Sequence, residues 1–126
     1  MLRGRILAES LRVGFELVVP SLGLVRVGRV DVSASRAPGQ PETWTLLDVT
    51  APDESADELA AALAAGLAVD GGWYADFRVG REHFVVFAGK VFRYTMGDTA
   101  GRDAAMAYGR SVGVPERQLD WDSSPT

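Results

Sequence analysis

Residues 73–94, WYADFRVGREHFVVFAGKVFRY, decide the fold of this protein, because they hold seven of its eleven aromatic side chains. Apolar and polar residues alternate along much of this stretch, and Gly80 and Gly89 divide it into three segments of strand length. Successive side chains of a β-strand point to opposite sides of the sheet. The pattern therefore predicts three consecutive antiparallel strands that form a sheet with two different faces.

The two glycines also set the expected register. A two-residue turn that begins at Gly80 places Phe77 opposite Phe84. The same turn at the second glycine places Phe87 opposite Phe92. A shift of either turn would change these pairs, so the register is a hypothesis.

The expected faces differ in polarity. The first is almost entirely apolar and carries Trp73, Ala75, Phe77, Phe84, Val86 and Val91. The second is amphipathic and carries Tyr74, Asp76, Arg78, His83, Val85, Phe87, Phe92 and Tyr94. Aromatic side chains of the second face need cover, either from a hairpin at residues 13–32 or from a second subunit.

Strand and helix signals extend in both directions from this stretch. Strands are expected at residues 3–8, 15–19, 24–32 and 42–50. A helix is expected after Ser55, which forms a capping box with Glu58, and a second one from Asp98 or Thr99 to Val112. Residues 33–41, SASRAPGQP, are predicted to be a loop.

These elements predict one α+β domain over residues 1–121. It consists of N-terminal strands in residues 1–32, the loop, and a main body at residues 42–121, followed by a frayed tail at residues 122–126. The order is an N-terminal β-hairpin region and then β-α-β-β-β-α, which is half of a ferredoxin-like layout. We expect a mostly antiparallel sheet with both helices on one face.

Composition excludes several classes of function. The 126 residues include no cysteine, which rules out disulfides, thiol nucleophiles and zinc-thiolate sites. The net charge of −4 argues against a nucleic-acid surface, although residues 1–41 carry six arginines and only three acidic residues. No apolar run approaches the length of a membrane span, so a cytoplasmic protein without a membrane partner is expected.

His83 is the one histidine in the chain, and the expected register places it opposite Arg78 and near Asp76. An imidazole beside a carboxylate can supply a general base near neutral pH. The sequence shows no nucleophile motif beside them, and a solvated turn residue is the simpler interpretation of this histidine. One histidine without cysteine makes a poor set of metal ligands, so neither a metal nor a cofactor is expected.

Three arginines are candidates for anion binding: Arg78, Arg93 and Arg102. The string GDTAGR at residues 97–102 enters the second predicted helix, where backbone N–H groups can meet an anion. It lacks the GK[ST] ending of a phosphate loop, so a capped helix start is the simpler interpretation. Surface ion pairing is the corresponding alternative for the arginines.

Three strings, GGWYADF, FVVFAGKVFRY and GRDAAMAYGRSVGVPERQLDW, lie between residues 71 and 121. Through them the chain resembles a family of small bacterial proteins of unknown function, over about residues 42–121. The resemblance supports the expected element boundaries. It implies no catalytic or binding residues.

Two functional hypotheses follow. The leading one is a non-catalytic module that self-associates or binds a protein partner through four aromatic side chains, namely Tyr74, Phe87, Phe92 and Tyr94. A possible homodimer is the partner that this hypothesis expects first.

The alternative is a small-molecule binding protein or a small enzyme. In this hypothesis a pocket lies between the aromatic face and residues 1–32. Arg78 or Arg93 holds an organic anion there, and Asp76 and His83 are possible acid–base groups.

Overall fold

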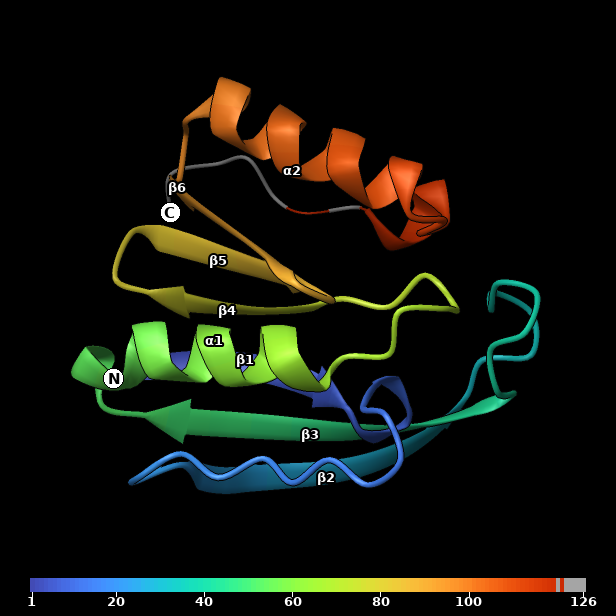
Figure 1. Ribbon diagram of the computed structural model, residues 1–126, viewed down its shortest axis with the longest axis horizontal. Helices are drawn as coiled ribbons and strands as arrows, with labels where there is room; N and C mark the ends of the chain where they lie inside the picture. Colours follow the sequence, from blue (N-terminus) through green and yellow to red (C-terminus); the bar gives the residue numbers. More distant parts are fainter. Residues whose placement is uncertain (120, 122–126) are drawn as a thin grey trace.

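A computed structural model describes residues 1–119 and 121. Within them, six strands form one sheet in the order β2-β3-β1-β4-β5-β6 (Figure 1). The strands are β1 (Leu2–Leu7), β2 (Gly23–Asp31), β3 (Thr43–Ala51), β4 (Ala75–Val79), β5 (Glu82–Phe87) and β6 (Lys90–Thr95). The helices are α1 (Ala56–Gly66) and α2 (Thr99–Ser111), with short 3-10 turns η1 (Ala8–Ser10), η2 (Asp53–Ser55) and η3 (Glu116–Gln118). The predicted tail at residues 122–126 lies outside the described residues.

The α+β class and the antiparallel sheet are confirmed, since all neighbouring strands pair antiparallel. Strands β3 and β4 both run antiparallel to β1, which lies between them. They are therefore parallel to each other, and β3-α1-β4 is a split β-α-β unit.

The three-stranded meander is confirmed with one change of register. Phe77 lies opposite Phe84, as predicted. Phe92 lies opposite Val85 instead of Phe87, because the second turn is formed by residues 88–89 and its glycine has the second position, with φ +72°. The pairing moves by two residues, so every side chain keeps its predicted face.

The N-terminal hairpin prediction is wrong. Residues 15–19 form no strand, and β1 lies in the middle of the sheet between β3 and β4. Strand β2 instead pairs with β3 at the edge. Burial explains the place of β1, because Leu2 and Ile6 are 0% and 2% exposed in the core beneath α1.

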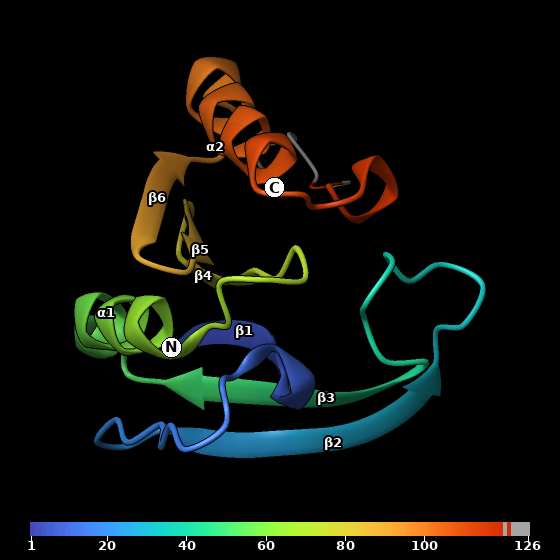
Figure 2. The same ribbon diagram turned by 45° about the vertical axis from the view of Figure 1, so that its right-hand side comes forward.

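The prediction that both helices cover one face is also wrong. Leu59 and Leu63 of α1 share a core with Phe77, Phe84 and other residues of the first face. Helix α2 packs on the second face, where its buried residues Ala105 and Met106 share a core with Val85, Phe87 and Tyr94. Figure 2 shows the meander between the two helices.

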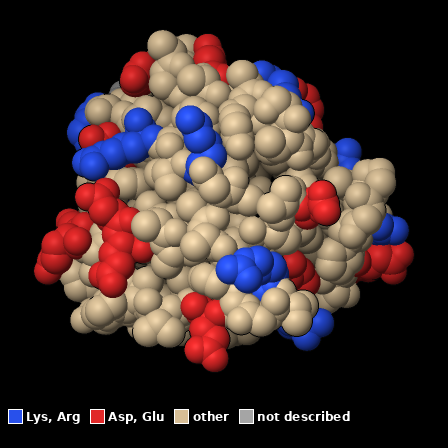
Figure 3. All heavy atoms as spheres, viewed as in Figure 1, with Lys and Arg blue, Asp and Glu red and all other residues tan. Residues whose placement is uncertain are grey.

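The two helix starts differ from each other. Asp98 caps α2 as predicted, because its carboxylate accepts a hydrogen bond from the Gly101 N–H at 3.1 Å. The capping box at Ser55 is not formed: this residue has helical backbone angles at the end of η2, and its side chain makes no capping bond. Acidic residues occupy the first turns of η2 and α1 instead, and acidic side chains gather over this end of α1 in Figure 3.

The loop between β2 and β3 is tied to the C-terminal segment. Gln40 is 2% exposed, and its amide donates to the carbonyl oxygen of Gly71 at 2.7 Å. Arg117 donates to the carbonyl oxygens of Ser35 and Arg36. Figure 2 shows this loop rising toward η3, and together they border one end of the sheet.

Candidate functional site

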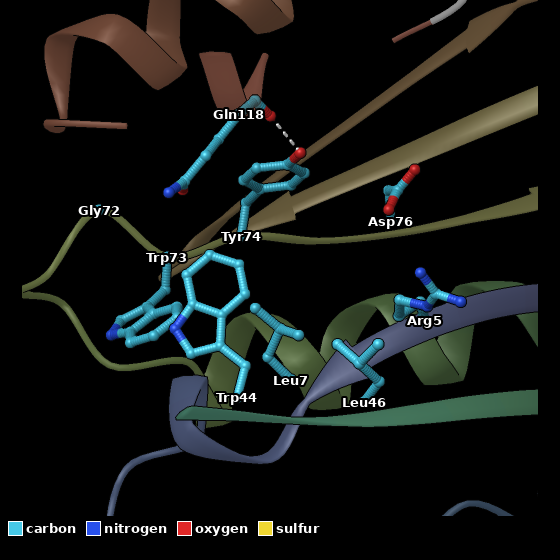
Figure 4. A pocket seen from close by; sticks show the side chains of 9 residues that line it. All are labelled: Arg5, Leu7, Trp44, Leu46, Gly72, Trp73, Tyr74, Asp76 and Gln118. Carbon is cyan, nitrogen blue, oxygen red and sulfur yellow. Dashed lines mark hydrogen bonds between the residues drawn. The ribbon is translucent and has the colours of Figure 1, made fainter. Parts of the chain in front are cut away.

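A groove lies on the sheet face opposite α1, where β3, β1 and β4 are not covered by α2. Two adjoining cavities form it, with volumes of about 250 and about 500 Å³. The smaller is lined by Arg5, Leu7, Trp44, Leu46, Gly72, Trp73, Tyr74, Asp76 and Gln118 (Figure 4). Arg5 and Asp76 line both cavities, so they lie where the two meet.

The smaller cavity is the apolar end of the groove. Leu7 and Leu46 come from neighbouring strands, and Tyr74 comes from the segment just before β4. The rings of Trp44 and Trp73 lie 5.7 Å apart at an angle of 59°. Such a lining of aromatic and aliphatic side chains is typical of sites for small organic molecules.

The larger cavity is the cationic end of the groove. Among the described residues, its lining includes four arginines, Arg3, Arg5, Arg26 and Arg78, and two carboxylates, Asp48 and Asp76. Like charges on directly opposite residues destabilise a sheet. Arg3 and Arg78 are such a pair, because they are register partners of β1 and β4.

The carboxylate of Asp48 holds Arg5 in place. The Nε and Nη2 atoms of Arg5 donate to its two oxygens at 2.7 and 3.2 Å. This hydrogen bonding lowers the pKa of Asp48 and raises the pKa of Arg5. Arg26 approaches the same carboxylate at 3.9 Å, so Asp48 serves two of the four arginines.

The predicted proximity of Asp76 and His83 is confirmed, but His83 is fully buried and is not a solvated turn residue. Its Nε2 lies 2.8 Å from Oδ2 of Asp76, and its Nδ1 lies 2.7 Å from the hydroxyl of Tyr94. Burial raises the pKa of the Tyr94 hydroxyl, which therefore keeps its proton and can donate to Nδ1. The Nε2–H then donates to the carboxylate, which can only accept while ionised.

Of the three candidate arginines, the structure brings only Arg78 into the groove. Its Nη1 lies 3.4 Å from the sulfur of Met96. Arg93 is on the opposite face of the sheet, with its guanidinium 4.9 Å from the ring centre of Phe84. Arg102, on α2, donates to the carbonyl oxygen of Trp121 and to its neighbour Asp103.

The four predicted interface aromatics are packed by the chain itself. Phe87 and Tyr94 are 1% and 5% exposed, and Tyr74 and Phe92 are partly buried beside them. Cover comes from α2 and the segment after it, including Tyr108, rather than from the N-terminal strands. A partner is therefore not needed to cover this face.

Sequence reasoning missed most of the groove lining. Arg3, Arg5, Trp44 and Leu46 lie on β1 and β3, whose place beside β4 depends on strand order. One signal was available: the alternation of arginines with Leu2 and Ile6 in residues 2–6 indicates one buried and one polar face.

The described residues contain neither a cluster of metal ligands nor a membrane-spanning helix. No three His, Asp or Glu side chains come together there in a way that could hold a metal ion. No helix among residues 1–119 is long and apolar enough to cross a membrane.

Comparison with known proteins identifies no relative: no protein-family model, no curated protein and no solved structure matches the chain. The resemblance to a bacterial family stays a prediction.

Proposed function

We propose that this protein binds a small organic anion in the groove, with the anionic group at the cationic end and an aromatic or aliphatic body at the apolar end. The observation that carries the proposal is the cross-strand pair of Arg3 and Arg78. No carboxylate of the described residues lies within ion-pair distance of either guanidinium. A bound carboxylate, sulfonate or phosphate would offset the repulsion between them.

The apolar end supports an organic ligand over an inorganic ion. Trp44, Trp73 and Tyr74 offer ring surfaces, and Leu7 and Leu46 cover the sheet between them. Burial of a ring on such surfaces adds to affinity in proportion to the apolar area removed from water. The groove thus recognises two unlike halves of one molecule.

Two fluorescent dyes with the same rings test this proposal. The first, 1-anilinonaphthalene-8-sulfonate, carries a sulfonate, which N-phenyl-1-naphthylamine lacks. We expect the sulfonate dye to bind the wild-type protein at one site, and Arg78→Gln to weaken it by at least about tenfold, because a charge-assisted hydrogen bond is lost. Titrations followed by dye fluorescence measure both affinities.

The matched control is Arg93→Gln, which removes an arginine from the opposite face. This variant should bind both dyes with wild-type affinity. Arg78→Gln should bind the uncharged dye with an affinity within about twofold of the wild-type value. If both arginine variants lost the same affinity for the sulfonate dye, the proposed site would be contradicted. Failure of either dye to bind the wild-type protein would contradict the groove itself.

Self-association is a second candidate function, and the edge strand β2 favours it. Leu24, Val25 and Val27 of this strand are 61%, 65% and 56% exposed. A second copy of the chain could pair antiparallel with β2 and continue the sheet across a two-fold axis. Arg26 and Arg29 lie on the same strand, so their repulsion would oppose the pairing at low salt.

Light scattering after size exclusion tests this second candidate. We expect a dimer fraction that rises with protein concentration and with salt, and Val27→Lys should abolish it. Val13→Lys is the matched control, because Val13 is fully exposed outside the strands. A monomer at every concentration and salt level would contradict self-association.

A further inference from the structure

Binding alone does not explain the carboxylate at the centre of the groove. Asp76 lines both cavities, and its side chain is 32% exposed. A carboxylate in the middle of an anion site repels the ligand that the arginines attract. Asp76 lies where the apolar end meets the cationic end, so a ligand that fills both ends passes beside it. A catalytic base has to lie within reach of the bound molecule in this way.

The groups beneath Asp76 hold it in one orientation. His83 is 0% exposed, and both of its ring nitrogens have partners: the hydroxyl of Tyr94 and Oδ2 of Asp76. The ring of Trp121 packs edge-on to the imidazole at 5.8 Å. Among the described residues no hydrogen bond engages Oδ1 of Asp76, which leaves this oxygen for a ligand.

A fixed cation lies beside this carboxylate. Arg5 is the register partner of Asp76 on the neighbouring strand, so both side chains lie on the groove face. Its guanidinium is held by the two bonds to Asp48. Charged groups that are fixed in advance stabilise developing charge at no cost of reorganisation.

We propose, on the basis of the groove's proposed function, that Asp76 is a catalytic base that removes a proton from a bound carbon acid, with Arg5 stabilising the resulting oxyanion. His83 and Tyr94 are positioning residues. The substrate class is an organic anion whose acidic C–H bond adjoins a carbonyl group, with an aromatic or aliphatic body that fits the apolar end.

The proposed step needs no co-reactant. The C–H bond breaks, its proton passes to Oδ1 of Asp76, and its electron pair moves to the carbonyl oxygen as an enolate beside Arg5. Where a carbon–carbon double bond adjoins the broken C–H bond, the enolate extends over it, and return of the same proton to the far carbon of that double bond gives an isomer and restores the carboxylate. The reaction class is therefore proton transfer at carbon.

An activated probe tests the base directly. In 5-nitrobenzisoxazole, transfer of the ring C–H proton to a carboxylate breaks the N–O bond and forms a coloured nitrophenolate, after which the base returns its proton to water. We expect the wild-type protein to show saturable product formation, and Asp76→Asn to lower kcat/KM by at least about 100-fold. Asp103→Asn, a surface carboxylate of α2, is the control and should keep the wild-type rate.

The dyes separate failure of catalysis from failure of binding. Asp76→Asn should still bind N-phenyl-1-naphthylamine as the wild type does, which also shows that it folds. Acetate at the same concentration gives the rate of an unplaced carboxylate. If the wild-type protein is no faster than acetate but binds the dye in a separate titration, the catalytic proposal is overturned and the binding site is not. Full activity of Asp76→Asn would overturn it equally.

The positioning role has a readout of its own, the separate values of kcat and KM. His83→Phe removes the donor that orients the carboxylate, so kcat should fall by at least about tenfold while KM stays within about twofold. Tyr94→Phe, a smaller change, should lower kcat to a lesser extent. An unchanged kcat in the folded variants would limit both residues to a structural role and overturn this part of the proposal.

Discussion

Replacement of Phe87 by alanine is expected to lower the free energy of unfolding by about 3–5 kcal/mol, the usual loss for a buried aromatic side chain. The residue is 1% exposed, and its ring lies 5.0 to 6.0 Å from the rings of Tyr74, Phe92 and Tyr108. Removal of the ring leaves a cavity between the sheet and α2 that these neighbours cannot fill. Urea unfolding followed by tryptophan fluorescence measures the change.

Val91→Ala is the matched control from the same meander. Its side chain is 39% exposed on the other face, so the expected change is within about 0.5 kcal/mol. Should Phe87→Ala leave the unfolding midpoint unchanged and instead dissociate an oligomer, the aromatic face would be an interface, as the leading hypothesis from sequence held. The two outcomes are distinguished by unfolding and light scattering on the same samples.

The meander could be predicted because its signals are local. Alternation and the two glycines lie within residues 73–94, and they place each side chain on its correct face. The second turn was misplaced because Gly89 suits either central position of a two-residue turn. The resulting error of two residues changes which rings are opposite one another and leaves the faces unchanged.

Placement of α2 had a signal that was not used. The run FVVF at residues 84–87 has no polar alternation, which is typical of a strand buried on both faces. In the structure these four side chains are at most 2% exposed, with α1 on one side and α2 on the other. Helices on both faces are the physical consequence of that run.

The centre of the candidate site was partly predictable, but its walls were not. Asp76 and His83 belong to adjacent strands of one local hairpin, so the register was enough to bring them together. Arg5 and Asp48 lie on β1 and β3, 71 and 28 residues before Asp76 in the sequence. Their place beside Asp76 depends on the insertion of β1 between β3 and β4, which no local pattern encodes.

Gly4→Val tests that insertion and is expected to destabilise the protein by about 3 kcal/mol, the upper end of the cost of overpacking. Gly4 is in the middle of β1, opposite both Val49 and Phe77. A Cβ atom at this position would lie 2.5 Å from Cβ of Phe77 and 2.8 Å from the carbonyl oxygen of Asp76. Neither of these atoms belongs to a flexible side-chain end, so the strands would have to separate.

Gly28→Val is the matched control, since this glycine lies on the edge strand β2 and a Cβ atom there would be 3.8 Å from Leu46. Valine favours extended backbone, so the expected change is between zero and about 1 kcal/mol of stabilisation. Urea unfolding of both variants measures the difference. If the two variants proved equally stable, β1 could not be packed tightly between two strands. The groove, which is lined by residues of β3, β1 and β4, would then not exist as described. A large loss for Gly4→Val alone would instead support the central strand that brings Arg5 and Asp76 side by side.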